Sequence, residues 1–255
     1  MRVRMEDLIR TVREAAPLFR DKERAAKIQV KGAADFVTQV DFQVQEYVKA
    51  RLEALEQEIQ FRGEEKDKGA FDFSRPAWIL DPVDGTTNLI HDFRASVISL
   101  ALWQDGDVRM GVVYQPYTDE MFTAVRGGGA FFNGEPIRVS SAAHLREALI
   151  SIGTSPYHKE LADENFRRFT EVFKRCGDIR RIGSAALELA YTACGRLDGF
   201  FERGLNPWDF AAGVLLVEEA GGQVTDFSGN PVDITQAGDI LASNGRIGGQ
   251  IREAL

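Results

Sequence analysis

Two aspartates separated by two residues, Asp81 and Asp84, stand where a short apolar run of the sequence ends. The run at 78–80 (Trp-Ile-Leu) predicts a buried strand, and Pro82 lacks the N–H that a strand ladder would use. Gly85 follows and permits a positive φ or a close backbone approach. We therefore expect the strand to stop at Asp81-Pro82 and the chain to turn sharply, with both carboxylates at the mouth of the turn.

The residues after this turn, Thr86 and Thr87, are good residues to begin a helix. The exposed N–H groups at a helix start suit a phosphate group. Carboxylates together with a backbone carbonyl suit a hard cation such as Mg²⁺. An isolated Asp-x-x-Asp pair often does no more than cap a helix. The full strand-turn-helix context instead predicts a site for metal and phosphate.

Two further acidic segments could complete such a site. Glu64 lies in a Gly-Glu-Glu triplet that closes an apolar run, and a loop glutamate of this kind is often only solvated. Asp209 lies in Asn-Pro-Trp-Asp at the start of an apolar helix. A carboxylate in a first helical turn also has an electrostatic reason to be there without any metal. The residues alone leave both alternatives open for Glu64 and Asp209.

The elements that must position these carboxylates change character along the chain. Alternating apolar patterns with Asp-Gly and Pro-Tyr turns predict an antiparallel meander of strands at 96–103, 108–115 and 120–125. Amphipathic patterns predict helices at 5–20, bent or ended by Pro17, and at 41–55, capped by Thr38. After about residue 148 the pattern alternates: strands at 149–152, 199–201, 223–226 and 240–242, and helices at 163–175, 185–194 and 208–220. We expect one domain whose halves, 1–145 and 146–255, share an interface.

Composition excludes several classes of protein. The 255 residues are 44% hydrophobic and carry a net charge of −8, with a pI near 5.1. An acidic surface of this kind argues against a broad nucleic-acid-binding face. No stretch is apolar enough for a signal peptide or a membrane span, and the two cysteines lack metal-ligand spacing. We expect a cytoplasmic protein with reduced thiols. The three histidines are scattered and predict no catalytic role.

Taken together, the acidic segments resemble the motifs of the inositol monophosphatase family, within the lithium-sensitive, metal-dependent phosphatases. The likeness is greatest to bacterial inositol-1-monophosphatases and spans about residues 31–245. The segments that carry the likeness are Gly63-Glu64-Glu65, Asp81-Pro-Val-Asp84-Gly-Thr-Thr-Asn88 and Trp208-Asp209 with Glu218-Glu-Ala-Gly-Gly222. Asp35-Phe-Val-Thr-Gln-Val-Asp41 matches an N-terminal family motif, and Gly183-Ser-Ala-Ala186 and Gly199-Phe-Phe-Glu202 match the substrate side.

The resemblance implies two or three Mg²⁺ ions per subunit. Glu64, Asp81 and the Val83 carbonyl would hold the first ion, and Asp81 would bridge to a second ion also held by Asp84 and Asp209. A third, weaker ion would depend mostly on water and Glu64. Carboxylates this close repel one another, so we expect metal binding to stabilise the fold.

The resemblance also implies a role for each remaining site residue. The attacking water would lie near Glu64 and Thr86, with Asp41 hydrogen-bonded to Thr86. The phosphate would rest on the Gly85 and Thr86 amides. The rest of the substrate would contact a set of mostly polar residues: Asp84, Ser184, Ala185, Glu202 and Asp209. For Ser184, capping the following helix is an equally good explanation.

The resemblance implies a mixed α and β fold with layered αβαβα architecture, lithium inhibition and, by analogy, a homodimer. Inositol-1-phosphate is the leading substrate. Fructose-1,6-bisphosphate, histidinol phosphate and 3′-phosphoadenosine phosphate remain alternatives because related phosphatases share the metal motifs. A non-catalytic, metal-binding regulatory protein is the alternative of a different class. Arg180 and Arg181 could bind a second phosphate or lie at a subunit interface, and the sequence leaves both possibilities open.

Overall fold

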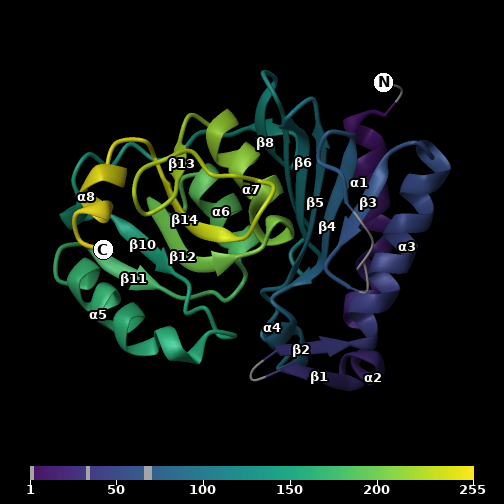
Figure 1. Ribbon diagram of the computed structural model, residues 1–255, viewed down its shortest axis with the longest axis horizontal. Helices are drawn as coiled ribbons and strands as arrows, with labels where there is room; N and C mark the ends of the chain where they lie inside the picture. Colours follow the sequence, from purple (N-terminus) through teal and green to yellow (C-terminus); the bar gives the residue numbers. More distant parts are fainter. Residues whose placement is uncertain (1–2, 33–34, 66–70) are drawn as a thin grey trace.

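The computed structural model describes residues 3–32, 35–65 and 71–255. Two large β-sheets, of seven and five strands, alternate with three layers of helices, and a third sheet has only two strands (Figure 1). The helices are, from one outer face to the other, α1 (Met5–Ala15) and α3 (Gln39–Leu55), then α6 (Ala185–Ala193) and α7 (Pro207–Glu219), then α5 (Ala162–Phe173) and α8 (Gly248–Arg252). The fold is therefore the mixed, layered αβαβα arrangement that the resemblance implied.

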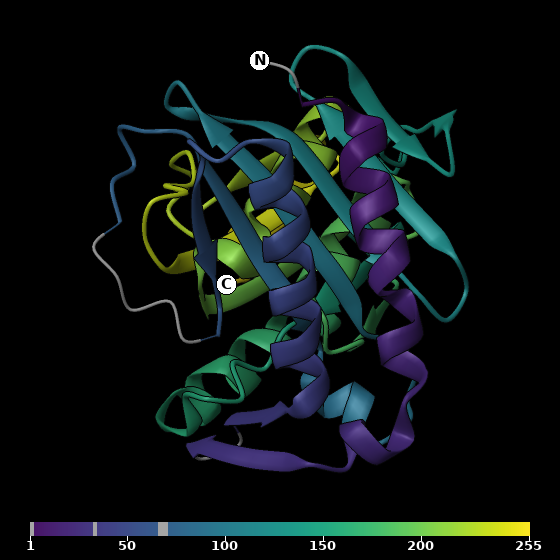
Figure 2. The ribbon, with the colours of Figure 1, turned by 90° about the vertical axis from the view of Figure 1, so that its right-hand side faces the viewer.

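The larger sheet has seven strands in an order that follows the chain. They are β3 (Gln60–Gly63), β4 (Ala77–Asp84), β5 (Val97–Gln104), β6 (Asp107–Gln115), β7 (Glu120–Val125), β8 (Gly129–Phe132) and β9 (Glu135–Pro136). Only β3 and β4 pair in parallel, and all later neighbours are antiparallel. The predicted meander is confirmed, and its three strands were placed to within one residue at each end. Figure 2 shows α1 and α3 lying across the outer face of this sheet.

The smaller sheet has five strands, in the order β11, β10, β12, β14, β13. Their bounds are Asp178–Arg180, Leu149–Ile152, Gly199–Leu205, Gly238–Ser243 and Gln223–Thr225. The first three run parallel to one another, and β14 pairs antiparallel with both of its neighbours. The predicted alternation of strands and helices is confirmed here. Only β11 was missed; two of its three residues, Asp178 and Arg180, are charged, so it shows no apolar run.

Strand β5 shows why the centre of the larger sheet is apolar along its whole length. Ile98, Leu100 and Leu102 pack in the cluster that includes α1 and α3. Val97 and Ala101 point the other way, into the cluster formed with α6 and α7. Because helices cover both faces of the sheet, both sets of alternating side chains are buried. This sheet therefore holds the ends of its strands rigidly.

The N-terminal elements differ partly from those predicted. Helix α1 gives way to a 3₁₀ turn, Ala16–Arg20, that contains Pro17, and Thr38 caps α3 through its hydroxyl, which accepts from Val40 N. Several short elements were not predicted from the periodicity of the sequence. These are α2 (Lys22–Ala25), the hairpin β1 (Ile28–Gly32) and β2 (Asp35–Thr38), and 3₁₀ turns at Leu145–Glu147 and Lys159–Leu161. The charged, glycine-containing stretch at 62–76 favours a loop, but Arg62 and Gly63 belong to β3, and residues 66–70 lie outside the described residues.

The prediction that β4 stops at Asp81-Pro82 is wrong. The strand continues to Asp84, with an irregularity in its pairing to β5 between Asp81 and Asp84. The parallel partner β3 pairs with β4 only as far as Leu80. Beyond that point β4 has one strand neighbour, so the missing N–H of Pro82 costs no ladder bond. This bulged end turns the two carboxylates toward the centre of the molecule.

The two halves of the chain share one buried core. Its members include Ile79 and Phe122 from before residue 145, and Leu189 and Phe210 from after it. No helix within the described ranges combines the length and the apolar character that crossing a bilayer requires.

Candidate active site

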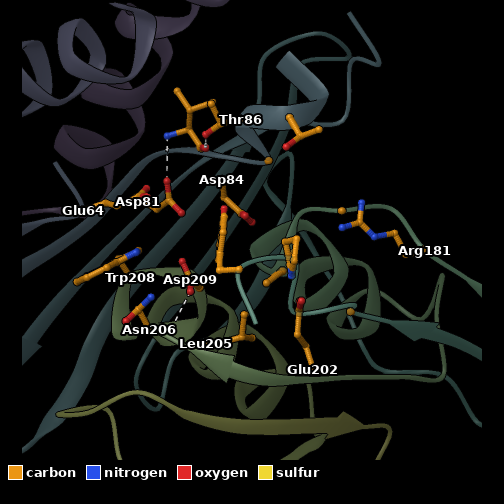
Figure 3. Close-up of a pocket in the computed structure, with 18 residues that line it drawn as sticks. Glu64, Asp81, Asp84, Thr86, Arg181, Glu202, Leu205, Asn206, Trp208 and Asp209 are labelled. Carbon is orange, nitrogen blue, oxygen red and sulfur yellow. Dashed lines mark hydrogen bonds between the residues drawn. The ribbon is translucent and has the colours of Figure 1, made fainter. Parts of the chain in front are cut away.

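An open cavity lies where β4 ends and the middle helices begin (Figure 3). Its volume is about 710 Å³, including the solvent-filled mouth. All the predicted site residues except Asp41 and Ser184 line it: Glu64, Asp81, Val83, Asp84, Gly85, Thr86, Ala185, Glu202 and Asp209. These residues come from segments up to 145 positions apart, Glu64 at one extreme and Asp209 at the other. The sequence motifs therefore converge on one place.

Asp84 is held against the start of α6. Its Oδ2 accepts hydrogen bonds from Ser184 Oγ and from Ala186 N, both at 2.7 Å. Ser184 Oγ in turn accepts from Leu187 N at 3.4 Å, so this residue caps α6 and also fixes Asp84. Ser184 is buried at 1% exposure and lies behind the cavity wall. Of the two explanations given for Ser184, capping is therefore the one that its hydrogen bonds support directly.

Asp41 lies behind Thr86, fully buried at the start of α3. Its Oδ2 accepts from Thr38 N at 2.8 Å and from Thr38 Oγ1 at 2.6 Å. Thr86 Oγ1 lies 3.0 Å from Asp41 Oδ1 and 3.1 Å from the Val83 carbonyl oxygen, and its single proton can serve one of them at a time. Burial raises the pKa of Asp41, and the hydrogen bonds from Thr38 and Thr86 oppose that rise. The carboxyl thus orients the Thr86 hydroxyl at the cavity edge.

Asp209 combines the two functions that the sequence left open. It lies in the first turn of α7, and its Oδ2 accepts from Asn206 N at 2.7 Å, which is a capping contact. Its side chain also lines the cavity with Glu64 and Asp81 (Figure 3). The helix start therefore fixes one carboxylate oxygen of Asp209 while the side chain still faces the cavity.

The electrostatics of the cavity favour a cation. Burial, and then the charges of Glu64 and Asp84, hold the pKa of Asp81 well above its usual range. Burial and the charges of Asp84 and Glu64 do the same for Asp209. For Asp84 burial raises the pKa to about 6, against the hydrogen bonds from Ser184 and Ala186. Carboxylates crowded in this way gain stability when a positive charge enters among them.

The donor set fits a hard divalent cation, because four carboxylates and the Val83 carbonyl supply only oxygen. Within the described ranges, no three carboxylate, imidazole or thiol groups already lie close enough to hold one ion together.

Three side chains to which sequence reasoning assigned no role support the site. Asn88 Nδ2 lies 2.9, 3.0 and 3.2 Å from the carbonyl oxygens of Ala95, Ile182 and Gly183, and so joins α4 (Thr86–Ile90) to the segment before α6. Gln45 bonds both backbone groups of Glu65, next to Glu64. Their partners are up to 95 residues away, and neither spacing nor periodicity could reveal such partners.

Glu188 is the third of these side chains. It is fully buried behind the cavity wall, and its Oε1 accepts from Ser151 Oγ at 2.7 Å and from Ile182 N at 2.9 Å. Its other oxygen has no hydrogen-bond partner among the described residues. Burial, and then the charge of Glu202, raise the pKa of Glu188 to about 8. Near neutral pH this carboxyl is therefore largely protonated.

This shift predicts a pH-dependent stability. The folded pKa of Glu188 exceeds the unfolded value, so its contribution is fully present below about pH 4.5 and is lost as the pH rises through 8. Glu188→Gln keeps the oxygen that accepts both hydrogen bonds and cannot ionise. We expect its Tm to match the wild type at pH 5 and to exceed it by several degrees at pH 8.5, measured by calorimetry. Exposed Glu53→Gln is the control, and a constant offset between Glu188→Gln and wild type at both pH values would disprove the assignment.

Comparisons with known proteins were made once this geometry had been established. A model of the inositol monophosphatase family matches residues 4–255. An inositol-1-monophosphatase of Rhizobium meliloti is 40% identical over 240 residues, which is 93% of this chain and 90% of that protein. A protein of Vibrio cholerae named Nus factor SuhB is also 40% identical, over 93% of this chain and 90% of its own length.

Solved structures show the same likeness. The crystal structure of the extragenic suppressor protein suhB from Bartonella henselae superposes with a TM-score of 0.92 at 36% identity. The match covers 98% of this chain and 97% of that one. The layered arrangement is therefore shared over the whole length.

Proposed function

This chain belongs to the inositol monophosphatase family, and we propose that it hydrolyses inositol-1-phosphate to inositol and phosphate with Mg²⁺ as its metal. Family members are phosphoric monoester hydrolases that act on phosphorylated small molecules and are generally metal-dependent. The observation that carries the finer proposal is the convergence of Glu64, Asp81, Asp84 and Asp209 on one cavity beside Thr86. The relatives named inositol-1-monophosphatase favour inositol phosphate among the possible monoesters.

In this proposal the carboxylates of Glu64, Asp81, Asp84 and Asp209 and the Val83 carbonyl hold two or three metal ions. When bound, divalent metal ions neutralise the phosphoryl charge and lower the pKa of a water molecule. The Gly85 and Thr86 amides receive the phosphate oxygens at the start of α4. Gly85 adopts φ of 90°, a left-handed conformation that favours glycine, and both Gly85 and Thr86 line the cavity. Ala185 and Glu202 also line the cavity and contact the hydroxyl-bearing part of the substrate.

Thr86 and Asp41 orient the attacking water. Asp41 accepts from the Thr86 hydroxyl, which leaves a lone pair on Thr86 Oγ1 to accept a hydrogen bond from water. As the water oxygen bonds to phosphorus, the bond from phosphorus to the inositol oxygen breaks. One water proton passes to Thr86 Oγ1 while Thr86 gives its own proton to Asp41, and the departing inositol oxygen takes up a proton from solvent water. Glu64 lines the same cavity as Thr86 and takes the second hydrogen bond of the water.

This arrangement predicts that Thr86→Ala lowers kcat about 100-fold, the usual size of a general acid–base contribution. Thr86→Ser keeps the hydroxyl and should retain most of the activity. Asp41→Asn should cost a similar factor, and Thr86→Ala with Asp41→Asn should cost no more than either change alone, since the two residues act as a unit. Steady-state kinetics on inositol-1-phosphate measure this, with circular dichroism as the folding control. If the double variant instead lost the product of the two single-variant factors, Thr86 and Asp41 would act independently, which would contradict the proposed proton transfer between them.

The test of the substrate is a ranked kcat/KM panel with Mg²⁺. It compares inositol-1-phosphate with fructose-1,6-bisphosphate, histidinol phosphate and 3′-phosphoadenosine phosphate. Inositol-1-phosphate is expected to rank first. A tenfold or greater preference for one of the others would reassign the substrate and keep the phosphatase, and the same assay with added lithium measures lithium sensitivity.

A second candidate function is a regulatory role without turnover, because relatives of 40% identity carry the name Nus factor SuhB. It predicts that metal raises the Tm while no ester of the panel is hydrolysed. We further propose a homodimer, which a light-scattering mass of one chain, 28.4 kDa, would refute.

A further inference from the structure

Arg62 joins two segments of the site that are far apart in the sequence. It lies in β3, two residues before Glu64. Its guanidinium carbon lies 5.6 Å from the ring centroid of Trp208, which immediately precedes Asp209 in the first turn of α7. The same carbon lies 5.6 Å from the ring centroid of Phe71. One cation in contact with two rings therefore connects the strand end that carries Glu64 with the helix start that carries Asp209.

Both of these rings are themselves anchored to β5. Phe71 packs edge-on against Phe73, with 4.5 Å between ring centroids, and Phe73 packs edge-on against Trp103 at 5.7 Å. Trp103 is buried in β5, and its Nε1 donates to the Phe73 carbonyl oxygen at 2.9 Å. The carbonyl oxygen of Trp208 accepts from Ser99 Oγ, also in β5, at 3.2 Å. The guanidinium therefore rests on parts of the molecule that are fixed.

Hydrogen bonds hold the backbone around Glu64. Its N–H donates to the Leu80 carbonyl oxygen of β4 at 3.1 Å, and Gln45 bonds both backbone groups of Glu65. These bonds attach the strand end to β4 and α3, and they leave its distance from α7 to other contacts. Arg62 supplies such a contact through the Trp208 ring.

The contacts of the Arg62 guanidinium are aromatic. Within the described ranges, no hydrogen bond and no carboxylate within 4.0 Å holds it. The face of an aromatic ring attracts a cation within about 6 Å of its centroid, and tryptophan does so most strongly. Arg62 is not among the described residues that line the cavity, whereas Trp208 is. Arg62 therefore acts on the site through its neighbours.

We propose that Arg62 is a positioning residue, which through Trp208 holds the segments of Glu64 and Asp209 together for metal binding. The inference rests on the proposed function, because these two carboxylates are metal ligands only in that account. Charge alone predicts the opposite effect, since a guanidinium near a cation site repels the entering ion. A positioning role makes Arg62 strengthen metal binding, and a purely electrostatic role makes it weaken metal binding.

Arg62→Met tests this sign, because it removes the guanidinium and keeps an unbranched side chain. Calorimetric titration of Mg²⁺ into chelator-treated, dialysed protein is expected to show a Kd raised roughly 3- to 30-fold, the size of one or two cation–π contacts. Arg62→Lys keeps the charge on a compact ammonium group, so its Kd should fall between those of Arg62→Met and wild type. It also decides the question should Arg62→Met unfold, which circular dichroism detects.

Kinetics give a second readout that a merely structural role would not move. The Mg²⁺ concentration for half-maximal hydrolysis of inositol-1-phosphate should rise in Arg62→Met by the same factor as the Kd. At saturating Mg²⁺, kcat should stay within about threefold of wild type, because the bound metal then holds the carboxylates in place.

Arg196→Met is the matched control. Arg196 also lies over two rings, at 5.0 Å from the Phe132 centroid and 4.7 Å from the Tyr191 centroid, and it is not among the described residues that line the cavity. Arg196→Met should lower the Tm, in part because it breaks a 2.6 Å ion pair with Glu120. It should leave the Kd for Mg²⁺ unchanged.

Three results would overturn the positioning role. They are an unchanged Kd in Arg62→Met, a lower Kd in that variant, and an equal rise in Arg196→Met, which would assign the effect to a general loss of stability. If the wild type binds Mg²⁺ and hydrolyses no ester, the proposed activity fails by itself, and the titrations still decide the role of Arg62. If the wild type binds no Mg²⁺, the metal site and the positioning role are both refuted.

Discussion

Asp84→Asn is expected to lower kcat/KM for inositol-1-phosphate by more than about 100-fold while the protein stays folded. In the proposed site Asp84 supplies a negative charge to a metal ion, and an amide supplies only a dipole. The amide of the variant would keep an oxygen in the position that accepts from Ser184 Oγ and Ala186 N, so the start of α6 should remain in place. Steady-state kinetics with saturating Mg²⁺ and thermal unfolding together measure the effect.

The matched control is Asp105→Asn, in the exposed turn between β5 and β6, which should leave both activity and Tm unchanged. Near wild-type turnover in Asp84→Asn would remove Asp84 from the metal site. A collapse of the Tm in that variant would instead show that Asp84 serves the fold through α6. The two failures are therefore distinguishable.

Neutralising Asp209 should have opposite effects on stability and turnover. Burial and the charges of Asp84 and Glu64 disfavour the ionised form of Asp209. Asp209→Asn keeps an oxygen for Asn206 N and removes this repulsion, so the Tm measured in chelator is expected to rise by several degrees. Turnover should fall by more than about 100-fold, because the same charge would hold metal.

Metal should relieve the same repulsion in the wild type. With free Mg²⁺ at about 100 times Kd, the Tm should rise by about 5–10 °C, from the free energy of binding and the usual size of the transition. Asp209→Asn should show a smaller rise, since it lacks one proposed ligand. Calorimetric scans with chelator and with Mg²⁺ give both quantities. Equal shifts in the two proteins would contradict the ligand assignment.

The sequence was most informative where a pattern repeats within a few residues. Strand β5 and helix α7 were predicted nearly to their ends because apolar side chains recur along them. The Asp81–Asn88 motif placed the end of β4 at the cavity. It misplaced the end of that strand by three residues, because the length of β3 decides whether Pro82 is tolerated, and that length cannot be read locally.

What the sequence could not supply were the contacts between distant segments. Ser184 and Asp209 each had two explanations, and capping contacts proved to be present at both positions. Asn88, Gln45 and Glu188 support the site through partners that only the fold brings near. Arg180 and Arg181 are adjacent and chemically identical, so only the structure shows which of them lines the cavity.

Release of phosphate from inositol-1-phosphate by the wild-type protein, with Mg²⁺ and with chelator, tests the central claim most directly. The carboxylate cavity predicts rapid release with Mg²⁺, none in chelator, and recovery when Mg²⁺ is restored. Equal release in chelator would show that the carboxylates act without metal and would contradict the proposed mechanism. No release in any tube, repeated across the ester panel, would contradict the proposed activity itself.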